Sequence, residues 1–89
     1  MTTRPPALTL LTQHQCALCD QAKEILGRVS AEGLGVVRTV DVSTPEGTAL
    51  AVGAAMAFPP ALLIDGEPFC YGRLSERRLR RELSRRAQR

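Results

Sequence analysis

Aromatic residues are scarce in this chain of 89 residues, which has no Trp, one Tyr and two Phe. Proteins that hold single-stranded nucleic acid stack its bases on aromatic side chains, so we expect no nucleic-acid partner. Long apolar runs are also missing, because none approaches the roughly 20 residues that a helix needs to cross a bilayer. The first residues show no secretory cleavage pattern. We therefore expect a protein that does not bind membranes and that works in the cytoplasm.

Cysteine is rare and odd in number, with three Cys beside a single His. That is too few for a secreted domain held together by disulfides. In a reducing compartment, two cysteines close together in the chain are more typical of catalysis or metal binding. The length suits one domain spanning residues 1–89. We expect residues 1–6 to form an N-terminal tail and residues from about 84 to 89 to form a frayed basic C-terminus.

Positive charge is concentrated near the C-terminal end. The net charge is only +3, but residues 73–89 contain eight Arg and two Glu. The simplest interpretation is the solvated face of a helix. The alternative is a surface for an acidic protein partner, whose rate of encounter the arginines would raise in a salt-dependent way.

The first part of the chain changes its hydrophobic period near residue 16. Residues 7–12 form a short apolar run that predicts a buried strand. From residue 16 to about residue 33, apolar residues recur at helical spacing. The apolar positions of this helix are Leu18, Ala22, Ile25, Leu26 and Val29. This order of strand, loop and helix places two cysteines in the first turn of the helix.

The middle of the chain predicts a second strand and a weaker helix. Residues 36–42 are rich in β-branched side chains, which is typical of a strand. Pro45 suits the first position of a helix, and Ser43 and Glu46 have the spacing of a capping box. This helix is expected to reach about Met56.

The last part of the chain predicts a hairpin followed by a helix. Strands are expected at residues 61–64 and 67–71, joined by Asp65-Gly66, which is a strong hairpin signal. Pro68 cannot donate to a sheet, so the second of these strands should lie at an edge. Ser75 is expected to cap the final helix. The inner face of that helix consists of Leu79, Leu83 and Ala87.

Cys16 and Cys19 lie three residues apart at the start of the first predicted helix. Thiol–disulfide exchange requires a thiolate, and a free cysteine with a pKa of about 8.5 is mostly protonated at neutral pH. The unpaired N–H groups and partial positive charge of a helix N-terminus stabilise an anion. Cys16 is outermost and is therefore expected to be the nucleophile. Cys19 is expected to resolve the mixed disulfide.

A metal site is the main alternative use of these cysteines. His14, Cys16, Cys19 and Cys70 would supply four nitrogen and sulfur ligands, the number that zinc prefers. Two chains could also share an iron–sulfur cluster. However, Cys70 is expected on the edge hairpin, where a small buried apolar residue is its ordinary role. We therefore expect no metal, and a non-enzymatic metal or cluster module remains the alternative function.

Three short stretches resemble glutaredoxins and their thioredoxin-fold relatives. CALCDQAKEIL, residues 16–26, is similar to the glutaredoxin active-site helix with its pattern Cys-x-x-Cys-x-x-Ala-Lys-x-x-Leu. PALLIDG resembles the segment in which a proline, here Pro60, opens the third strand. YGRLSE is similar to the turn before the last helix, with Gly72 as its glycine. The Cys-x-Leu-Cys start is shared with short bacterial glutaredoxin-like proteins.

This resemblance implies a thioredoxin-like α/β fold with the order β-α-β-α-β-β-α, a four-stranded mixed sheet flanked by helices. It implies dithiol exchange on protein or small-molecule disulfides by a monomer without a cofactor, with a low-molecular-weight thiol or a reductase as electron donor. Pro60 is then a cis-proline that shapes the substrate groove together with Gly72. Pro59 departs from the pattern, because it offers an extended substrate a carbonyl but no N–H.

Three ionisable neighbours are expected to tune the dithiol. Asp20 adds negative charge to the first turn of the helix and opposes the thiolate. Lys23 favours the thiolate if it reaches the site, and is otherwise an ordinary exposed lysine. His14 is either a loop histidine or a positive charge near Cys16. Glutaredoxins often carry Lys where this chain has Gln13, so the identity of the reductant stays open.

Overall fold

Four strands and three helices make up residues 4–88, the part of the chain that the computed structural model describes. In chain order they are β1 (Ala7–Thr12), α1 (Ala17–Ala31), β2 (Val36–Asp41), α2 (Pro45–Gly53), β3 (Ala61–Ile64), β4 (Glu67–Tyr71) and α3 (Glu76–Ala87). This is the predicted order. Residues 1–3 of the expected tail and Arg89 of the expected frayed end lie outside the described range. Within that range, no helix has the length and apolar character needed to cross a membrane.

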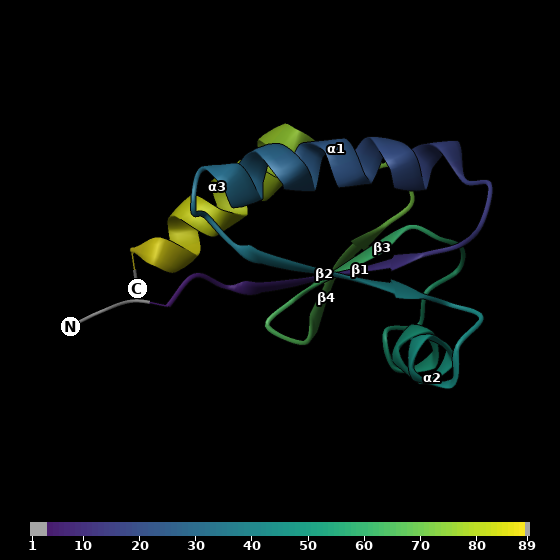
Figure 1. Cartoon of the computed structure of the whole chain (residues 1–89). Coiled ribbons are helices and arrows are strands. Elements are labelled where there is room, and N and C mark those ends of the chain that lie inside the picture. The colour runs from purple at the N-terminus through teal and green to yellow at the C-terminus, as the bar shows by residue number, and fades with distance from the viewer. Residues whose placement is uncertain (1–3, 89) are drawn as a thin grey trace.

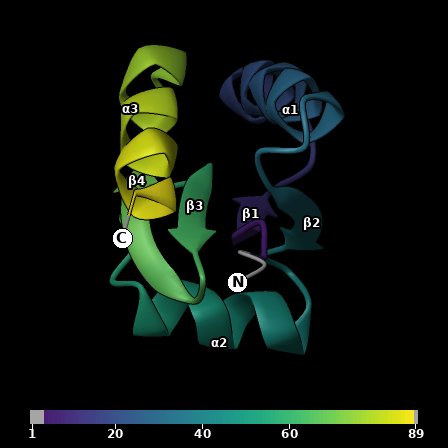
Figure 2. The same ribbon diagram turned by 90° about the vertical axis from the view of Figure 1, so that its left-hand side faces the viewer.

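The strands form one mixed sheet in the order β2-β1-β3-β4. β1 runs parallel to β2 and antiparallel to β3, and β4 runs antiparallel to β3. α1 and α3 lie side by side on one face of the sheet, and α2 lies alone on the other face (Figures 1 and 2). The two central strands are almost completely buried, as expected for strands with continuous apolar sequences.

Most of the hydrophobic core lies between the sheet and the two helices α1 and α3. Its buried members are Leu8, Leu10, Ala22, Leu26, Val29, Leu62, Ile64, Leu74, Leu79 and Leu83. A smaller cluster on the α2 face consists of Leu11, Val40 and Ala61. Burying a Leu or Ile side chain contributes about 1.5–3 kcal/mol. Most of the buried apolar side chains of the core therefore lie on the face covered by α1 and α3.

A tight turn joins β3 to β4 at the edge of the sheet. Asp65 and Gly66 have φ values of +51° and +83°, the left-handed pair that an Asp-Gly hairpin turn favours. The backbone N–H of Ala7 donates to Oδ1 of Asp65 (2.9 Å), which ties the turn to the start of β1. Pro68 lies in the outer strand as predicted, because an edge position tolerates its missing N–H.

The two ends of α2 differ from the prediction. The N-cap is Thr44, whose Oγ1 accepts a hydrogen bond from the N–H of Gly47 (3.0 Å). Ser43 is not the cap, because its N–H and Oγ both donate to Oδ1 of Asp41 (2.7 Å each). The helix ends at Gly53 and does not reach Met56, since Ala55 takes a left-handed backbone with φ +52°.

An ion-pair network joins α3 to α1. Glu76 contacts Arg28 of α1 (2.7 Å) and Arg80 of its own helix (3.0 Å). Arg80 also contacts Glu32, which caps the C-terminus of α1 (2.7 Å). Part of the positive charge concentrated in this helix is therefore neutralised between the two helices.

The cap and the inner face of α3 can be compared with those of the predicted helix. Ser75 is the N-cap as expected, and its Oγ accepts from the N–H of Arg78 (3.2 Å). The helix extends to Ala87. Leu79 and Leu83 are buried, but Ala87 is exposed and does not belong to the inner face. The reason is that the last turn of α3 extends past the end of the sheet (Figure 1).

Candidate active site

The strand register brings three loops to one end of the sheet. Ala61 of β3 pairs with Leu11 of β1 on one side and with Tyr71 of β4 on the other. The loop after β1, the loop before β3 and the turn after β4 therefore meet at the same end. These three segments carry Cys16, Pro60 and Gly72.

Cys16 and Cys19 form a disulfide at the N-terminus of α1, with their Cα atoms 5.2 Å apart. Cys16 is the N-cap residue, and its Sγ accepts a hydrogen bond from the backbone N–H of Cys19 (3.1 Å). Cys16 is half-buried, whereas Cys19 is only 1% exposed. The accessible sulfur is thus the one to which the helix N-terminus offers an N–H. A helix N-terminus that offers an N–H to a sulfur favours the thiolate over the thiol.

Pro60 and Gly72 hold two of the three loops together. The peptide bond between Pro59 and Pro60 is cis, and Pro60 is buried. The carbonyl of Pro60 accepts a hydrogen bond from the N–H of Gly72 (2.6 Å). Gly72 has φ +81°, and a Cβ there would approach the Phe58 ring to 3.1 Å. Only glycine meets both the backbone and the steric requirement at this position.

The three expected tuning residues, His14, Asp20 and Lys23, are all exposed. Asp41, which the sequence reasoning did not single out, lies at the end of β2 beside Thr12. Hydrogen bonds from Ser43, and then the positive charges of His14 and Lys23, hold the pKa of Asp41 below its usual range. The sequence contained a signal for Asp41, because this residue lies near the end of the second predicted strand. Parallel strands end at the same edge of a sheet, so Asp41 is expected near the loop that follows the first strand.

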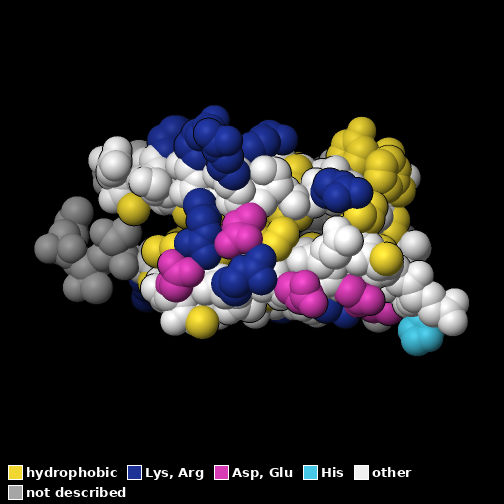
Figure 3. All heavy atoms as spheres, turned by 90° about the horizontal axis from the view of Figure 1, so that it is seen from above, with side chains coloured by type: hydrophobic (Ala, Val, Ile, Leu, Met, Phe, Trp, Pro, Cys, Tyr) yellow, Lys and Arg dark blue, Asp and Glu magenta, His cyan; other side chains and the backbone are white. Residues whose placement is uncertain are grey.

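Phe58 and Tyr71 are further residues that the sequence reasoning missed. Their rings meet edge to face, with centroids 5.3 Å apart, and each side chain is 51% exposed. A hydrophobic group of side chains lies at the same end of the molecule as the single histidine, which is cyan in Figure 3. The sequence contained a signal for both residues. Of only three aromatic residues, Phe58 stands shortly before Pro60 and Tyr71 directly before Gly72.

The structure does not assemble the four-ligand metal set. Cys70 is half-buried on β4 and packs against the core under α1 and α3. Its burial raises the pKa of its thiol, so the thiol stays protonated at neutral pH. Within residues 4–88, no group of three or more His, Cys, Asp or Glu side chains is arranged to hold a metal ion. Cys70 therefore does not complete a set of four metal ligands with His14, Cys16 and Cys19.

Comparison with known proteins assigns the fold and the family of this chain. The solution structure of an uncharacterized thioredoxin-like protein from Clostridium perfringens matches with a TM-score of 0.74 at 18% identity, covering 94% of this chain and 72% of that one. The fold is thus thioredoxin-like, as predicted. The family described as Glutaredoxin-like domain (DUF836) matches residues 7–84. The chain belongs to this glutaredoxin-like family.

Two mycobacterial proteins are relatives over most of their length. An uncharacterized protein of Mycobacterium tuberculosis is 32% identical over 83 residues, which cover 90% of this chain and 84% of that protein. An uncharacterized protein of Mycobacterium bovis matches with the same identity and coverage. The resemblance to glutaredoxin-like proteins that the motifs indicated is confirmed.

Proposed function

We propose that this protein is a thiol–disulfide oxidoreductase that exchanges disulfides through Cys16 and Cys19. The observation that carries the proposal is the position of Cys16 at the N-cap of α1, with its Sγ accepting the N–H of Cys19. Membership of a glutaredoxin-like family supports it. The site of action is proposed to be the cytoplasm, where thiols are kept reduced.

The reaction consists of two displacements at sulfur. The Cys16 thiolate attacks one sulfur of a substrate disulfide, which forms a mixed disulfide and releases the other substrate sulfur as a thiolate. Cys19, after losing its proton, attacks Sγ of Cys16 and releases the second substrate thiolate. Two electrons pass to the substrate, and the protons lost by the two cysteines balance those taken up by the two products. The protein is left with the Cys16–Cys19 disulfide.

Regeneration requires two electrons from a reductant, for which a low-molecular-weight thiol or a dithiol reductase is suitable. A first thiol attacks Sγ of Cys16, and a second thiol then resolves that mixed disulfide. No resident cofactor or metal is needed for either half of the cycle, and one chain supplies both cysteines. Which thiol serves as the reductant depends on the loops around the site.

Pro59, Pro60 and Gly72 are proposed to form the substrate groove. A substrate main chain lying along this loop can donate an N–H to the carbonyl of Pro59. It receives no N–H in return, because proline has none. The hydrogen bond from Gly72 to the Pro60 carbonyl supports this proposal, because it ties together the two segments that would form the groove. His14, Asp20 and Lys23 are proposed to set the charge around the Cys16 thiolate.

A redox titration tests the proposal. The protein and a Cys70→Ser variant are equilibrated in dithiol buffers, alkylated and weighed by mass spectrometry. We expect reversible closure of one disulfide in both proteins, with a midpoint between about −120 and −270 mV. A pair that does not close, or that closes only after a chelator removes a metal, would contradict the proposal and favour the metal or cluster module.

A further inference from the structure

We propose that the surface next to the dithiol binds an acidic segment of a disulfide-containing protein. The surface, called here the aromatic–arginine face, consists of Phe58, Tyr71, Arg73, Arg77, Arg78 and Arg81. This inference rests on the proposed function, because it names the class of partner whose disulfide reaches Cys16. It is carried by three observations on the described residues: the pairing of charges, the exposed aromatic pair, and the groove between them.

The first observation is that the ion pairs around α3 leave one set of arginines without acidic partners. The acidic side chains that form ion pairs with this helix contact other arginines: Glu32, Asp65, Glu76 and Glu82 bind Arg28, Arg80, Arg85 and Arg86. Within residues 4–88, the four arginines of the aromatic–arginine face form no salt bridge and are all exposed. In Figure 3 the dark blue side chains along the upper margin have no magenta neighbours, whereas those between the helices do.

The second observation is the exposure of the aromatic pair. Phe58 and Tyr71 are each 51% exposed, although they are two of only three aromatic residues in the chain. Their edge-to-face contact holds two large apolar side chains together at the end of the sheet where the loop with Cys16 lies. Ordered, half-exposed aromatic side chains are typical anchors for a protein partner.

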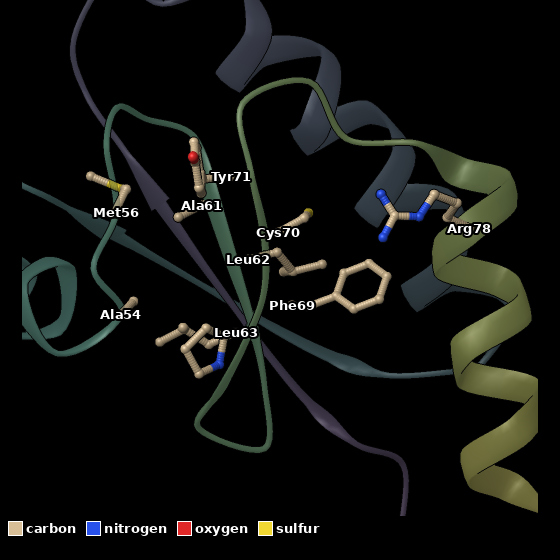
Figure 4. A pocket seen from close by; sticks show the side chains of 10 residues that line it. Ala54, Met56, Ala61, Leu62, Leu63, Phe69, Cys70, Tyr71 and Arg78 are labelled. Atoms are coloured by element: carbon tan, nitrogen blue, oxygen red, sulfur yellow. The ribbon is translucent and has the colours of Figure 1, made fainter.

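The third observation is a groove that connects the aromatic and arginine parts. A pocket of about 390 Å³ follows β4, with Tyr71 and Met56 toward one end and Phe69 and Arg78 toward the other (Figure 4). The guanidinium of Arg78 lies 5.6 Å from the centre of the Phe69 ring, which holds the charge beside the groove. An extended segment in this groove passes from the dithiol end of the sheet to α3.

These features together fit an acidic protein segment better than a nucleic acid. The reaction requires a disulfide, which a protein supplies and a nucleic acid does not. Guanidinium groups form paired hydrogen bonds with carboxylates. We therefore infer a substrate in which an apolar residue lies next to the reactive disulfide and two or more Asp or Glu residues follow a few positions away.

The test uses three disulfide substrates with the full-length protein in its reduced form. Two are peptides with the same internal disulfide and the same flanking Leu, one carrying four Glu and the other four Lys at the same positions. The third is bis(2-hydroxyethyl) disulfide, which is small and uncharged. Each peptide rate is divided by the rate for the uncharged disulfide on the same protein preparation, at 50 mM and at 500 mM salt.

Two triple variants lose the same net charge. Comparing them separates the effect of losing arginines from this surface from the effect of a lower net charge. Arg73→Gln/Arg77→Gln/Arg81→Gln removes charge from the aromatic–arginine face. The control, Arg4→Gln/Arg38→Gln/Arg85→Gln, removes three exposed arginines elsewhere, two of them from ion pairs. A third variant, Phe58→Ala, removes one anchor and is compared with Val52→Ala, which shortens an apolar side chain that is 76% exposed on α2.

We expect the Glu peptide to react about tenfold faster than the Lys peptide at 50 mM salt, with the difference largely lost at 500 mM. The face variant should lose this preference, and the control should keep it. Phe58→Ala should slow both peptides several-fold relative to the uncharged disulfide, and Val52→Ala should not. Equal rates for the two peptides, or equal losses in the face variant and the control, would overturn the inference.

The remaining outcomes distinguish the inference from the function on which it rests. If the uncharged disulfide is reduced but the Glu peptide has no advantage, only the acidic partner is wrong. If the protein reduces none of the three substrates, the proposed function fails and the docking surface with it. If the two peptides react equally while a single-stranded oligonucleotide binds at 150 mM salt and the face variant does not bind it, the arginines serve a nucleic acid instead.

Discussion

The two faces of the sheet are packed very differently. On one face α1 and α3 cover a core that includes Leu26 and Leu79, neither of which is exposed at all. On the other face α2 lies alone above a small cluster, and Gly47 is its only fully buried residue. The candidate site combines a segment from each face of the sheet. The cysteines begin α1, and the loop with Pro60 follows α2.

This difference sets the surroundings of the cysteine pair apart from those of the loop that carries Pro60. Cys16 and Cys19 are held by the helix with the stronger packing, which keeps the two sulfur atoms in fixed positions. The loop between α2 and β3 is anchored at Pro60, but its Phe58 side chain is half-exposed. The cysteine pair is therefore set in the better-packed part of the fold, and the loop beside it exposes an apolar side chain.

The largest effect is expected from a change that removes the chemistry and leaves the packing. Cys16→Ser should reduce disulfide exchange to the background rate, because serine does not form a disulfide with the substrate. The free energy of unfolding of the reduced protein should hardly change, since Cys16 is only half-buried. Cys19→Ser should instead trap a mixed disulfide that mass spectrometry detects. Full activity of Cys16→Ser would exclude it as the nucleophile.

A pair of leucine variants tests the comparison of the two faces directly. Leu26→Ala, under α1, should lower the free energy of unfolding by about 2–5 kcal/mol, because it leaves a cavity in a fully buried position. Leu50→Ala, on the half-buried side of α2, should cost about 1 kcal/mol or less. Urea unfolding of both variants measures the difference. Equal losses would mean that the α2 face contributes as much as the α1 face.

Two glycine-to-alanine changes in helices should have opposite signs. A Cβ at Gly47 of α2 would overlap the backbone carbonyl of Asp41, so Gly47→Ala should destabilise the fold by about 1–3 kcal/mol. A Cβ at Gly27 of α1 meets nothing, so Gly27→Ala should stabilise by about 0.5–1 kcal/mol. Thermal unfolding at pH 7 compares them. A stabilising Gly47→Ala would show that α2 shifts freely on the sheet.

The smallest effect is expected from acid titration of the network between α1 and α3. Hydrogen bonds from Arg28 and Arg80 hold the pKa of Glu76 below its usual range, and Arg80 does the same for Glu32. Because the folded pKa is lower than the unfolded pKa, this stabilisation is present above about pH 4.3 and is lost as the pH falls through the folded pKa. Glu32 and Arg28 are exposed and Glu76 is half-buried, so water and salt should weaken the effect.

Unfolding at pH 7 and pH 3 for the wild type and Glu76→Gln measures this contribution. The variant should be slightly less stable at pH 7 and should lose less stability on acidification. The control is Glu24→Gln, which changes an exposed glutamate of α1 that has no salt bridge among the described residues. The same pH dependence in all three proteins would show that the network does not stabilise the packing of α3.

Local signals explain why so much of the fold could be predicted. The change of period near residue 16, the Asp65-Gly66 turn, Pro68 and Ser75 each act through neighbours in the chain, so each was read correctly. The prediction failed where two local solutions compete. Ser43 and Thr44 can both cap a helix, and the hydrogen bonds of Ser43 to Asp41 decide which of them does so.

The sequence by itself determined the order of elements, the family and the pair of cysteines at a helix N-terminus. Only the tertiary structure decided which residues surround that pair and which arginines of residues 4–88 form no salt bridge. The register of β1, β3 and β4 brings the loops of Pro60 and Gly72 to the dithiol end. The pairing of Arg28 with Glu76 and of Arg80 with Glu32 spans 48 residues in each case. Such contacts depend on packing between distant segments, and no local pattern encodes them.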